Sequence, residues 1–229
     1  MASTPMTGIF DEAPAGLSPS ILLAMLPGAH MKAQDFRVEG MIDILRGRDY
    51  PIDVLVLDTG MDDYLDYGIA KRLHDGIAPT LAALPRRKLW LLGISLGALG
   101  ALLYARAHPQ TVEGLILLSP FIGTRGQIAE IASAGGLSAW AFSAREPSPE
   151  RDLLAWLAQY TPEDKNYPEM LLAYGTEDRF ARAHRLVADL LPEDRVVAVP
   201  GGHDWESWRV LWERLLGMTP LATRFGGGR

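Results

Sequence analysis

Six apolar runs of strand length recur along the chain, at residues 21–26, 54–57, 89–94, 115–118, 170–174 and 196–199. The runs are nearly continuous in Ile, Leu, Val and Met, which is typical of parallel strands that are buried on both faces. Amphipathic stretches lie between them, for example from Leu65 to Leu81, where every fourth residue is apolar. This alternation predicts an α/β protein with about six mostly parallel strands and with helices on both faces of the sheet.

One interval interrupts this alternation. About fifty residues separate the runs that end at Leu118 and begin at Met170, far more than a usual crossover loop. The segments Ser-Pro-Glu at 148–150 and Thr-Pro-Glu-Asp at 161–164 both resemble helix starts with an N-cap followed by proline. We therefore expect residues 124–167 to form a small helical, lid-like insertion. The chain as a whole, residues 1–229, is expected to form a single domain with flexible ends at residues 1–18 and 222–229.

A serine lies directly after the third run, in the segment Gly-Ile-Ser-Leu-Gly at residues 93–97. A serine at a sharp strand-to-helix turn needs small residues two positions before and after it, and Gly93 and Gly97 meet this need. The turn also places Ser95 at a helix N-terminus, where the N–H of Leu96 can donate to an oxyanion. The motif alone is weak, and a glycine-rich turn with an idle serine is the alternative. Its position between a strand and a helix makes Ser95 the predicted nucleophile.

A serine hydroxyl needs a base to take its proton, and the base must itself be oriented. Among the five histidines, His203 follows the last apolar run in a Pro-Gly-Gly-His loop, at the edge where open α/β sheets bind ligands. Asp178 follows the fifth run and is the predicted acid. Glu177 is the rival, and Asp204 is better placed to cap the final helix. The chain order Ser95, Asp178, His203 is the one expected for a serine at such a turn.

The loop after the first run, Leu-Pro-Gly-Ala-His at residues 26–30, is expected to supply a second oxyanion donor. The N–H of Ala29 is the first candidate and that of His30 the second. The side chain of His30 could also border the substrate. Trp140 and Trp156 in the insertion are expected to cover the acyl side of the pocket, although each could simply pack the insertion onto the core.

These residues resemble the α/β-hydrolase superfamily over roughly residues 19–216. The segment GISLGA at 93–98 matches its nucleophile elbow, and GTED at 175–178 matches its acid turn. The segment PGGHDW at 200–205 is similar to the histidine loop of bacterial esterases of the esterase D and enterochelin-esterase type, which implies that Trp205 lies beside the substrate. The resemblance implies acyl hydrolysis without a metal or an organic cofactor. The chain departs from the family pattern in two ways, because it lacks room before Ile21 for two leading antiparallel strands and reads Pro-Gly-Ala-His where many members have His-Gly.

Composition and charge limit the partners. The chain has no cysteine, which excludes disulfides and thiolate metal sites and is compatible with a reducing compartment. A net charge of −6 argues against binding to nucleic acid or to an anionic membrane. No apolar run is long enough to span a bilayer, and no signal peptide is evident. We therefore expect a cytoplasmic protein whose partner is a small-molecule acyl substrate, and the oligomeric state stays open.

The leading hypothesis is a serine hydrolase that cleaves a carboxylic ester or thioester through an acyl-enzyme. An acyltransferase with the same three residues is the alternative among enzymes, since only the acceptor of the acyl group differs. A non-catalytic binding protein on the same scaffold is the alternative from another class.

Overall fold

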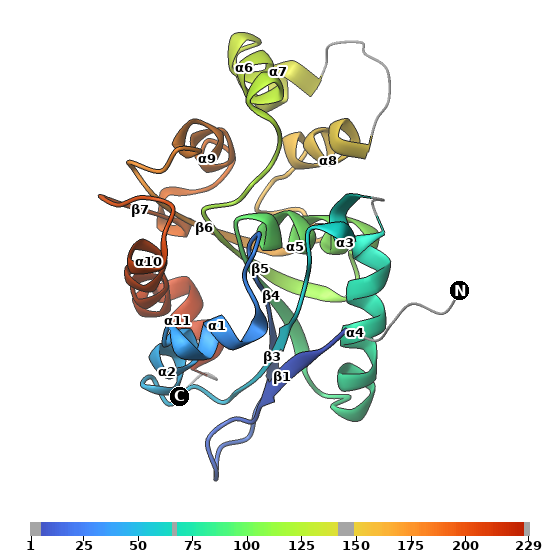
Figure 1. Ribbon diagram of the computed structural model, residues 1–229, viewed down its shortest axis with the longest axis vertical. Coiled ribbons are helices and arrows are strands. Elements are labelled where there is room, and N and C mark those ends of the chain that lie inside the picture. The colour runs from blue at the N-terminus through green and yellow to red at the C-terminus, as the bar shows by residue number, and fades with distance from the viewer. Residues whose placement is uncertain (1–5, 66–67, 142–148, 227–229) are drawn as a thin grey trace.

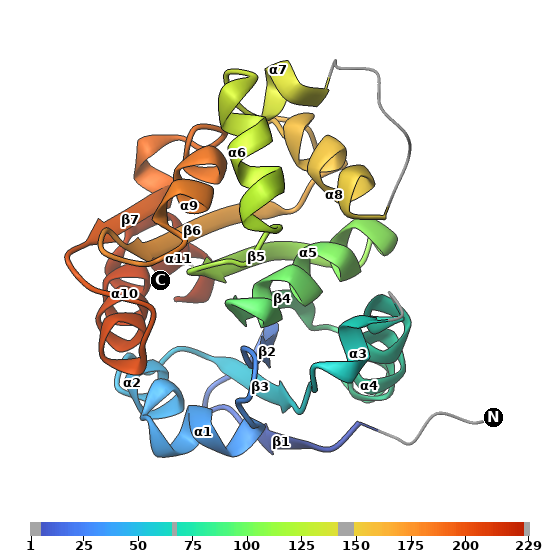
Figure 2. The same cartoon turned by 45° about the horizontal axis from the view of Figure 1, so that its top comes forward.

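Seven strands form one sheet in the described part of the chain, which comprises residues 6–65, 68–141 and 149–226 of the computed structural model. The order is β1-β3-β2-β4-β5-β6-β7 (Figure 1, with β2 labelled in Figure 2). β1 is antiparallel to β3, and the other neighbouring pairs are parallel. The parallel strands therefore end at one common edge. The bounds are β1 (Gly8–Asp11), β2 (Ile21–Leu26), β3 (Ile52–Leu57), β4 (Lys88–Ile94), β5 (Val112–Leu118), β6 (Glu169–Gly175) and β7 (Val196–Val199).

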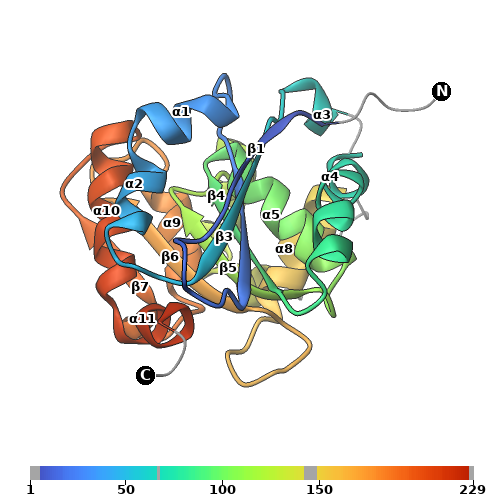
Figure 3. The same ribbon diagram turned by 90° about the horizontal axis from the view of Figure 1, so that it is seen from below.

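Helices cover both faces of this sheet (Figure 3). One face carries α1 (Ala33–Val38), α2 (Met41–Arg46), α10 (Trp205–Gly217) and α11 (Thr219–Phe225). The other carries α3 (Asp62–Leu65), α4 (Ile69–Ala83), α5 (Leu96–Ala107), α6 (Arg125–Ser133), α7 (Leu137–Ala141), α8 (Pro149–Ala158) and α9 (Ala181–Ala188). A short 3₁₀ helix, Glu193–Arg195, precedes β7. The expected arrangement of a mostly parallel sheet between two helical layers is confirmed.

Two hydrophobic clusters hold these layers together, one on each face of the sheet. The side chains of a strand alternate between them, so that Leu91 joins the cluster under α5 while Trp90 joins the cluster under α10 and α11. Trp90 is 1% exposed, and its indole lies over Gly114, where a Cβ would come within 2.5 Å of the ring. Phe225 meets the same indole edge-on at 5.3 Å between ring centres. The final helix is thereby part of the core.

Both ends of the chain are more ordered than expected. Residues Gly8–Asp11, inside the segment predicted to be flexible, form β1 at the edge of the sheet, and Arg46 donates to the Asp11 carboxylate at 2.8 Å from Nε. The sheet therefore has one leading antiparallel strand where the sequence predicted none, and seven strands instead of about six. At the other end, α11 extends to the buried Phe225, so the flexible segment predicted from residue 222 is wrong as far as residue 225. Residues 1–5 and 227–229 lie outside the described part of the chain.

The described residues of the interval between β5 and β6 form three helices, α6, α7 and α8, which Figure 2 shows together at the top of the molecule. Leu153, Leu154 and Leu157 of α8 are buried in the same cluster as α5, so this helix lies on the sheet face that α5 covers. α8 begins at Pro149, next to the expected start, whereas Thr161-Pro162-Glu163-Asp164 forms turns and not a helix. No described helix is both long enough and apolar enough to cross a membrane.

Candidate active site

Ser95 occupies the turn between β4 and α5, with φ 52° and ψ −111°, a conformation that side-chain-bearing residues rarely adopt. The turn is possible because its neighbours are glycines. A Cβ on Gly97 would lie 2.1 Å from the carbonyl oxygen of Leu26, and one on Gly93 would lie 2.4 Å from the backbone of α5. The carbonyl oxygen of Ser95 accepts from the N–H of Phe121 at 3.0 Å. These contacts fix the serine at the carboxyl edge of the sheet.

His203 lies between Ser95 and Asp178 and is in hydrogen-bonding range of both. Its Nε2 is 2.9 Å from Ser95 Oγ, and its Nδ1 is 2.7 Å from Asp178 Oδ2. An imidazole that carries its proton on Nδ1 donates to the carboxylate and accepts from the hydroxyl. The loop that presents His203 turns at Gly201, whose φ is 147°, and the N–H of Gly202 donates to a side-chain oxygen in the first turn of α10 at 2.8 Å.

The structure brings Asp178, and not Glu177, to the histidine. Asp178 is buried, whereas Glu177 is exposed, and the N–H of Phe180 donates to Asp178 Oδ1 at 2.8 Å. Burial alone would raise the pKa of Asp178, but the hydrogen bonds from His203 and from the N–H of Phe180 outweigh it and lower the pKa below its ordinary value. Asp178 is therefore a carboxylate at neutral pH. Asp204 accepts from a backbone N–H at 2.9 Å and caps α10, as expected.

Backbone N–H groups next to Ser95 and in the turn after β2 have no acceptor among the described residues. They belong to Leu96, the first residue of α5, and to Ala29 and His30, the first and second candidates in the turn after β2. Gly28 lets this turn approach the nucleophile, because a Cβ there would lie 3.4 Å from the Cβ of Ser95. The N–H of Gly28 itself donates to a methionine sulfur at 3.0 Å. Leu96 and Ala29 thus have the free donors that an oxyanion hole requires.

Two phenylalanines that the sequence pattern did not single out frame the histidine. The ring of Phe180 stands edge-on to His203 at 5.2 Å, and Phe121 stands edge-on to Phe180 at 5.9 Å. Phe121 comes three residues after β5, and Phe180 comes two residues after Asp178. Position alone could have identified them, since residues that follow parallel strands meet at the carboxyl edge of the sheet.

Two of the predicted substrate-binding residues, His30 and Trp205, lie in segments that follow β2 and β7. His30 is exposed at the end of the turn after β2, with φ 63°. Trp205 begins α10 and packs edge-on against Trp208 at 5.2 Å, which in turn meets the His203 ring at 5.1 Å.

The two tryptophans of the insertion contact other parts of the insertion. Trp140 is buried, donates from Nε1 to Glu130 at 2.6 Å and has the Arg151 guanidinium 5.3 Å from its ring centre. The ring of Trp156 lies 5.1 Å from that of Tyr167. These contacts differ from the expectation that both indoles line the acyl pocket, because they hold the indoles within the insertion itself.

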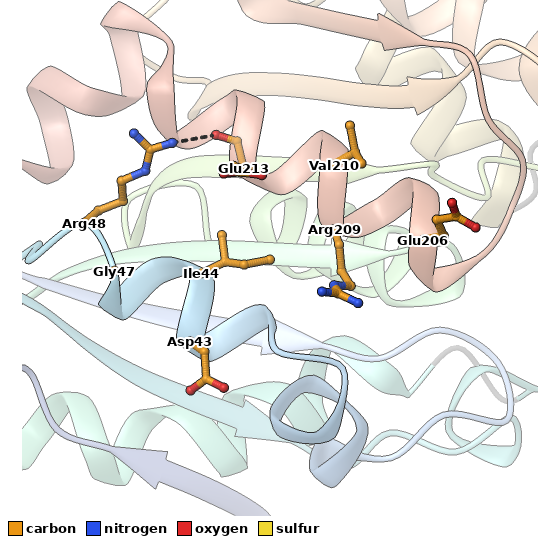
Figure 4. Close-up of a pocket in the computed structure, with 8 residues that line it drawn as sticks. All are labelled: Asp43, Ile44, Gly47, Arg48, Glu206, Arg209, Val210 and Glu213. Carbon is orange, nitrogen blue, oxygen red and sulfur yellow. Dashed lines mark hydrogen bonds between the residues drawn. The ribbon is translucent and has the colours of Figure 1, made fainter.

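A separate hollow of about 470 Å³ lies between α2 and α10 (Figure 4). No residue of the Ser95, His203 and Asp178 group lines it. Its walls carry charges of both signs, with Asp43, Glu206 and Glu213 beside Arg48 and Arg209. Within the described residues, no group of three or more His, Asp or Glu side chains could hold a metal ion.

A histidine that the sequence pattern did not single out lies buried behind Asp178. His184 on α9 is fully buried, and its Nδ1 is 4.0 Å from Asp178 Oδ2. Neither ring nitrogen has a hydrogen-bond partner in the described part of the chain. Burial lowers the pKa of His184 from 6.5 to about 4, so the folded protein holds this imidazole neutral at pH values where the unfolded chain protonates it.

Acidification between about pH 6.5 and pH 4 should therefore destabilise the fold through His184. Across this window the unfolded state binds the additional proton, so the free energy of unfolding falls as the pH falls, by about 3 kcal/mol at the lower end. We expect His184→Gln to remove this contribution, which urea unfolding of both proteins at several pH values would measure. The difference between their free energies of unfolding should change with pH. Parallel curves would contradict the assignment.

The seven-stranded sheet, the strained serine turn and the histidine loop at its carboxyl edge define the α/β-hydrolase class. Residues 57–217 match the family described as "Putative esterase". The matched segment covers most of the chain. The chain belongs to this esterase family, and the protein is an enzyme that acts on esters.

Solved structures share this fold over almost the whole chain. The S-formylglutathione hydrolase FrmB from Staphylococcus aureus has a TM-score of 0.63 at 15% identity, covering 89% of this chain and 82% of its own. The serine hydrolase FphF from the same organism has a TM-score of 0.63 at 16% identity, covering 93% and 98%. MGS-MChE2, an α/β-hydrolase from a lagoon-sediment metagenome of Mar Chica, Morocco, has a TM-score of 0.58 at 15% identity, covering 98% and 97%. No curated protein matches the sequence.

Proposed function

We propose that this enzyme cleaves a carboxylic ester or a thioester through an acyl-enzyme on Ser95. The observation that carries the proposal is the continuous contact from Ser95 Oγ through the His203 ring to the buried Asp178 carboxylate, at 2.9 Å and 2.7 Å. This series of side chains lets the imidazole take the hydroxyl proton while the carboxylate stabilises the resulting imidazolium.

The proposed reaction proceeds in two steps, acylation and deacylation of Ser95, which use only groups present at the site and water. Ser95 Oγ bonds to the carbonyl carbon as its proton passes to His203 Nε2, and the carbonyl oxygen becomes an oxyanion that accepts from the N–H groups of Leu96 and Ala29. The bond to the leaving oxygen or sulfur then breaks, and His203 returns the proton to that atom. Water then attacks the acyl carbon as one of its protons passes to His203 Nε2. The bond to Ser95 Oγ breaks, His203 returns the proton to this oxygen, and a carboxylic acid is released.

Labelling with a fluorophosphonate tests this assignment directly. The reagent should phosphonylate Ser95, because only an activated serine displaces fluoride rapidly. Mass spectrometry of the digested protein should place one adduct on the peptide that contains Ser95. Ser133, an exposed serine on α6, is the internal control and should stay unmodified. An adduct on another serine, or an equal rate of labelling in His203→Ala, would contradict the proposal.

A further inference from the structure

A cavity of about 230 Å³ lies between the start of α6 and the start of α9, close to the triad of Ser95, His203 and Asp178. Three arginines line it, Arg125 from α6 and Arg179 and Arg182 from the α9 side. Ile128 and Ala183 contribute an apolar part of its wall. No carboxylate lines the cavity, in contrast to the hollow of mixed charge between α2 and α10.

None of these three arginines forms an ion pair with a carboxylate in the described part of the chain, although the protein is acidic overall. Elsewhere guanidinium groups meet carboxylates, as Arg46 does with Asp11 at 2.5 Å and Arg87 with Asp53 at 2.7 Å. Guanidinium groups bind carboxylates and phosphates through two parallel hydrogen bonds, and several around one concavity reinforce each other. The cavity therefore has the chemistry of an anion site.

The cavity shares a wall with the triad. Phe180 lines it, and the same ring stands edge-on to His203 at 5.2 Å. The Arg179 guanidinium carbon lies 4.9 Å from the centre of the Phe180 ring, which holds one of the three charges against this wall. The Phe180 ring thus contacts both the Arg179 guanidinium and the His203 imidazole.

The position beside the histidine indicates which half of the substrate reaches the arginines. His203 must protonate the leaving oxygen or sulfur, so the leaving group lies on the histidine side of the scissile bond. A negative charge a few bonds beyond that atom can pass Phe180 and meet the arginines.

We propose that this cavity binds an anionic group, a carboxylate or a phosphate, on the alcohol or thiol half of the substrate. The inference rests on the proposed hydrolysis at Ser95 and narrows it to esters or thioesters whose leaving group is negatively charged. Arg125, Arg179 and Arg182 are then residues that determine specificity.

The test compares leaving groups that differ only in charge. Acetyl thioesters of mercapto acids of increasing chain length are each paired with the acetyl thioester of the matching mercapto amide. One further thioester carries a phosphate in place of the carboxylate. Thiol release gives kcat/KM for each. At the chain length that reaches the cavity, the acid should exceed the amide by about tenfold at low salt, and the preference should shrink as NaCl is added. The phosphate member shows which anion is preferred.

The ratio of acid to amide should fall to about one in the triple variant Arg125→Gln, Arg179→Gln, Arg182→Gln. Each variant is its own reference, because a general loss of activity or folding affects both thioesters. Arg185→Gln, at an exposed arginine of α9 outside the cavity, is the matched control and should keep the wild-type ratio.

A second readout does not need turnover. 4-Hydroxybutanoate should raise the melting temperature of the wild type more than 4-hydroxybutanamide does, and the triple variant should lose this difference. If the wild type hydrolyses the thioesters of the mercapto amides, and the ratio of acid to amide in kcat/KM is near one at every chain length, the anion site is overturned. The proposed function is then unaffected. Absence of any hydrolysis and of a Ser95 adduct would contradict the proposed function, and the melting temperatures would then decide the anion site alone.

Discussion

Replacing Ser95 by alanine should lower kcat by about 10⁶-fold, with only the contribution of substrate binding and of the oxyanion donors remaining. The loss is this large because, in the proposed mechanism, the hydroxyl is the atom that forms the acyl-enzyme, and His203 and Asp178 act only through it. The measurement is the release of acid from a short-chain aryl ester, with the melting temperature followed in parallel. The melting temperature should change little, since alanine removes one oxygen and keeps the strained backbone of the turn.

Ser119 offers a matched control for this substitution. It directly follows β5 as Ser95 follows β4, its φ is 45°, and its buried hydroxyl has no hydrogen-bond partner among the described residues. Ser119→Ala should therefore keep kcat within a small factor. Equal losses in the two variants would show that the effect comes from the fold and not from the nucleophile.

Replacing Asp178 by asparagine should lower kcat by about 10⁴-fold with little change in KM. The two carboxylate oxygens have separate partners, because Oδ1 accepts from the N–H of Phe180 and Oδ2 from His203 Nδ1. An asparagine has only one oxygen. If that oxygen accepts from Phe180, the amide NH₂ faces the imidazole and forces its proton onto Nε2, where it cannot accept from Ser95. The negative charge that stabilises the imidazolium is lost as well.

Glu177→Gln is the control for this prediction, since Glu177 is adjacent in sequence and exposed to solvent. It contributes its backbone N–H, which donates to the carbonyl oxygen of Gly201 at 3.0 Å, and this bond survives the substitution. Its kcat should stay within a few-fold of the wild type. A larger loss in Glu177→Gln than in Asp178→Asn would move the acid by one residue.

The parallel strands could be predicted from the sequence because each is a continuous apolar run, which has one stable place in a sheet covered on both faces. β1 could not, since Gly-Ile-Phe-Asp is short, alternates between exposed and half-buried positions, and is specified by its pairing with β3. The segment from Thr161 to Asp164 shows the converse error. Its residues favour a helix start, but the same residues also favour turns, and no apolar stripe follows to continue a helix.

The residues of the site differ in how far they could be predicted. Ser95 and His203 are marked by glycines, because close backbone approach leaves a trace in the sequence. The choice between Asp178 and Glu177 depends on which of two adjacent side chains points into the protein, which a pattern of residue types does not specify. Trp140 was identifiable as an aromatic of the insertion, but the direction of its indole depends on Glu130 and Arg151, which only the folded insertion brings to it.

His203 and Asp178, the proposed base and acid, follow the last two strands of the sheet, and we expect this arrangement to determine how the enzyme loses activity. β7 has four residues, three of them at least partly exposed, and among the strands of the described chain it pairs only with β6. The N–H of Thr176 donates to the carbonyl oxygen of Val199 at 2.8 Å, so the acid loop is tied to this outer strand. Edge segments open at a lower free energy than the core. Detachment of β7 would carry His203 away from Ser95 while β2, β4 and β5 stay folded. We therefore expect fraying of this peripheral strand to limit the working lifetime of the enzyme, so that inactivation on heating precedes the melting of the protein as a whole.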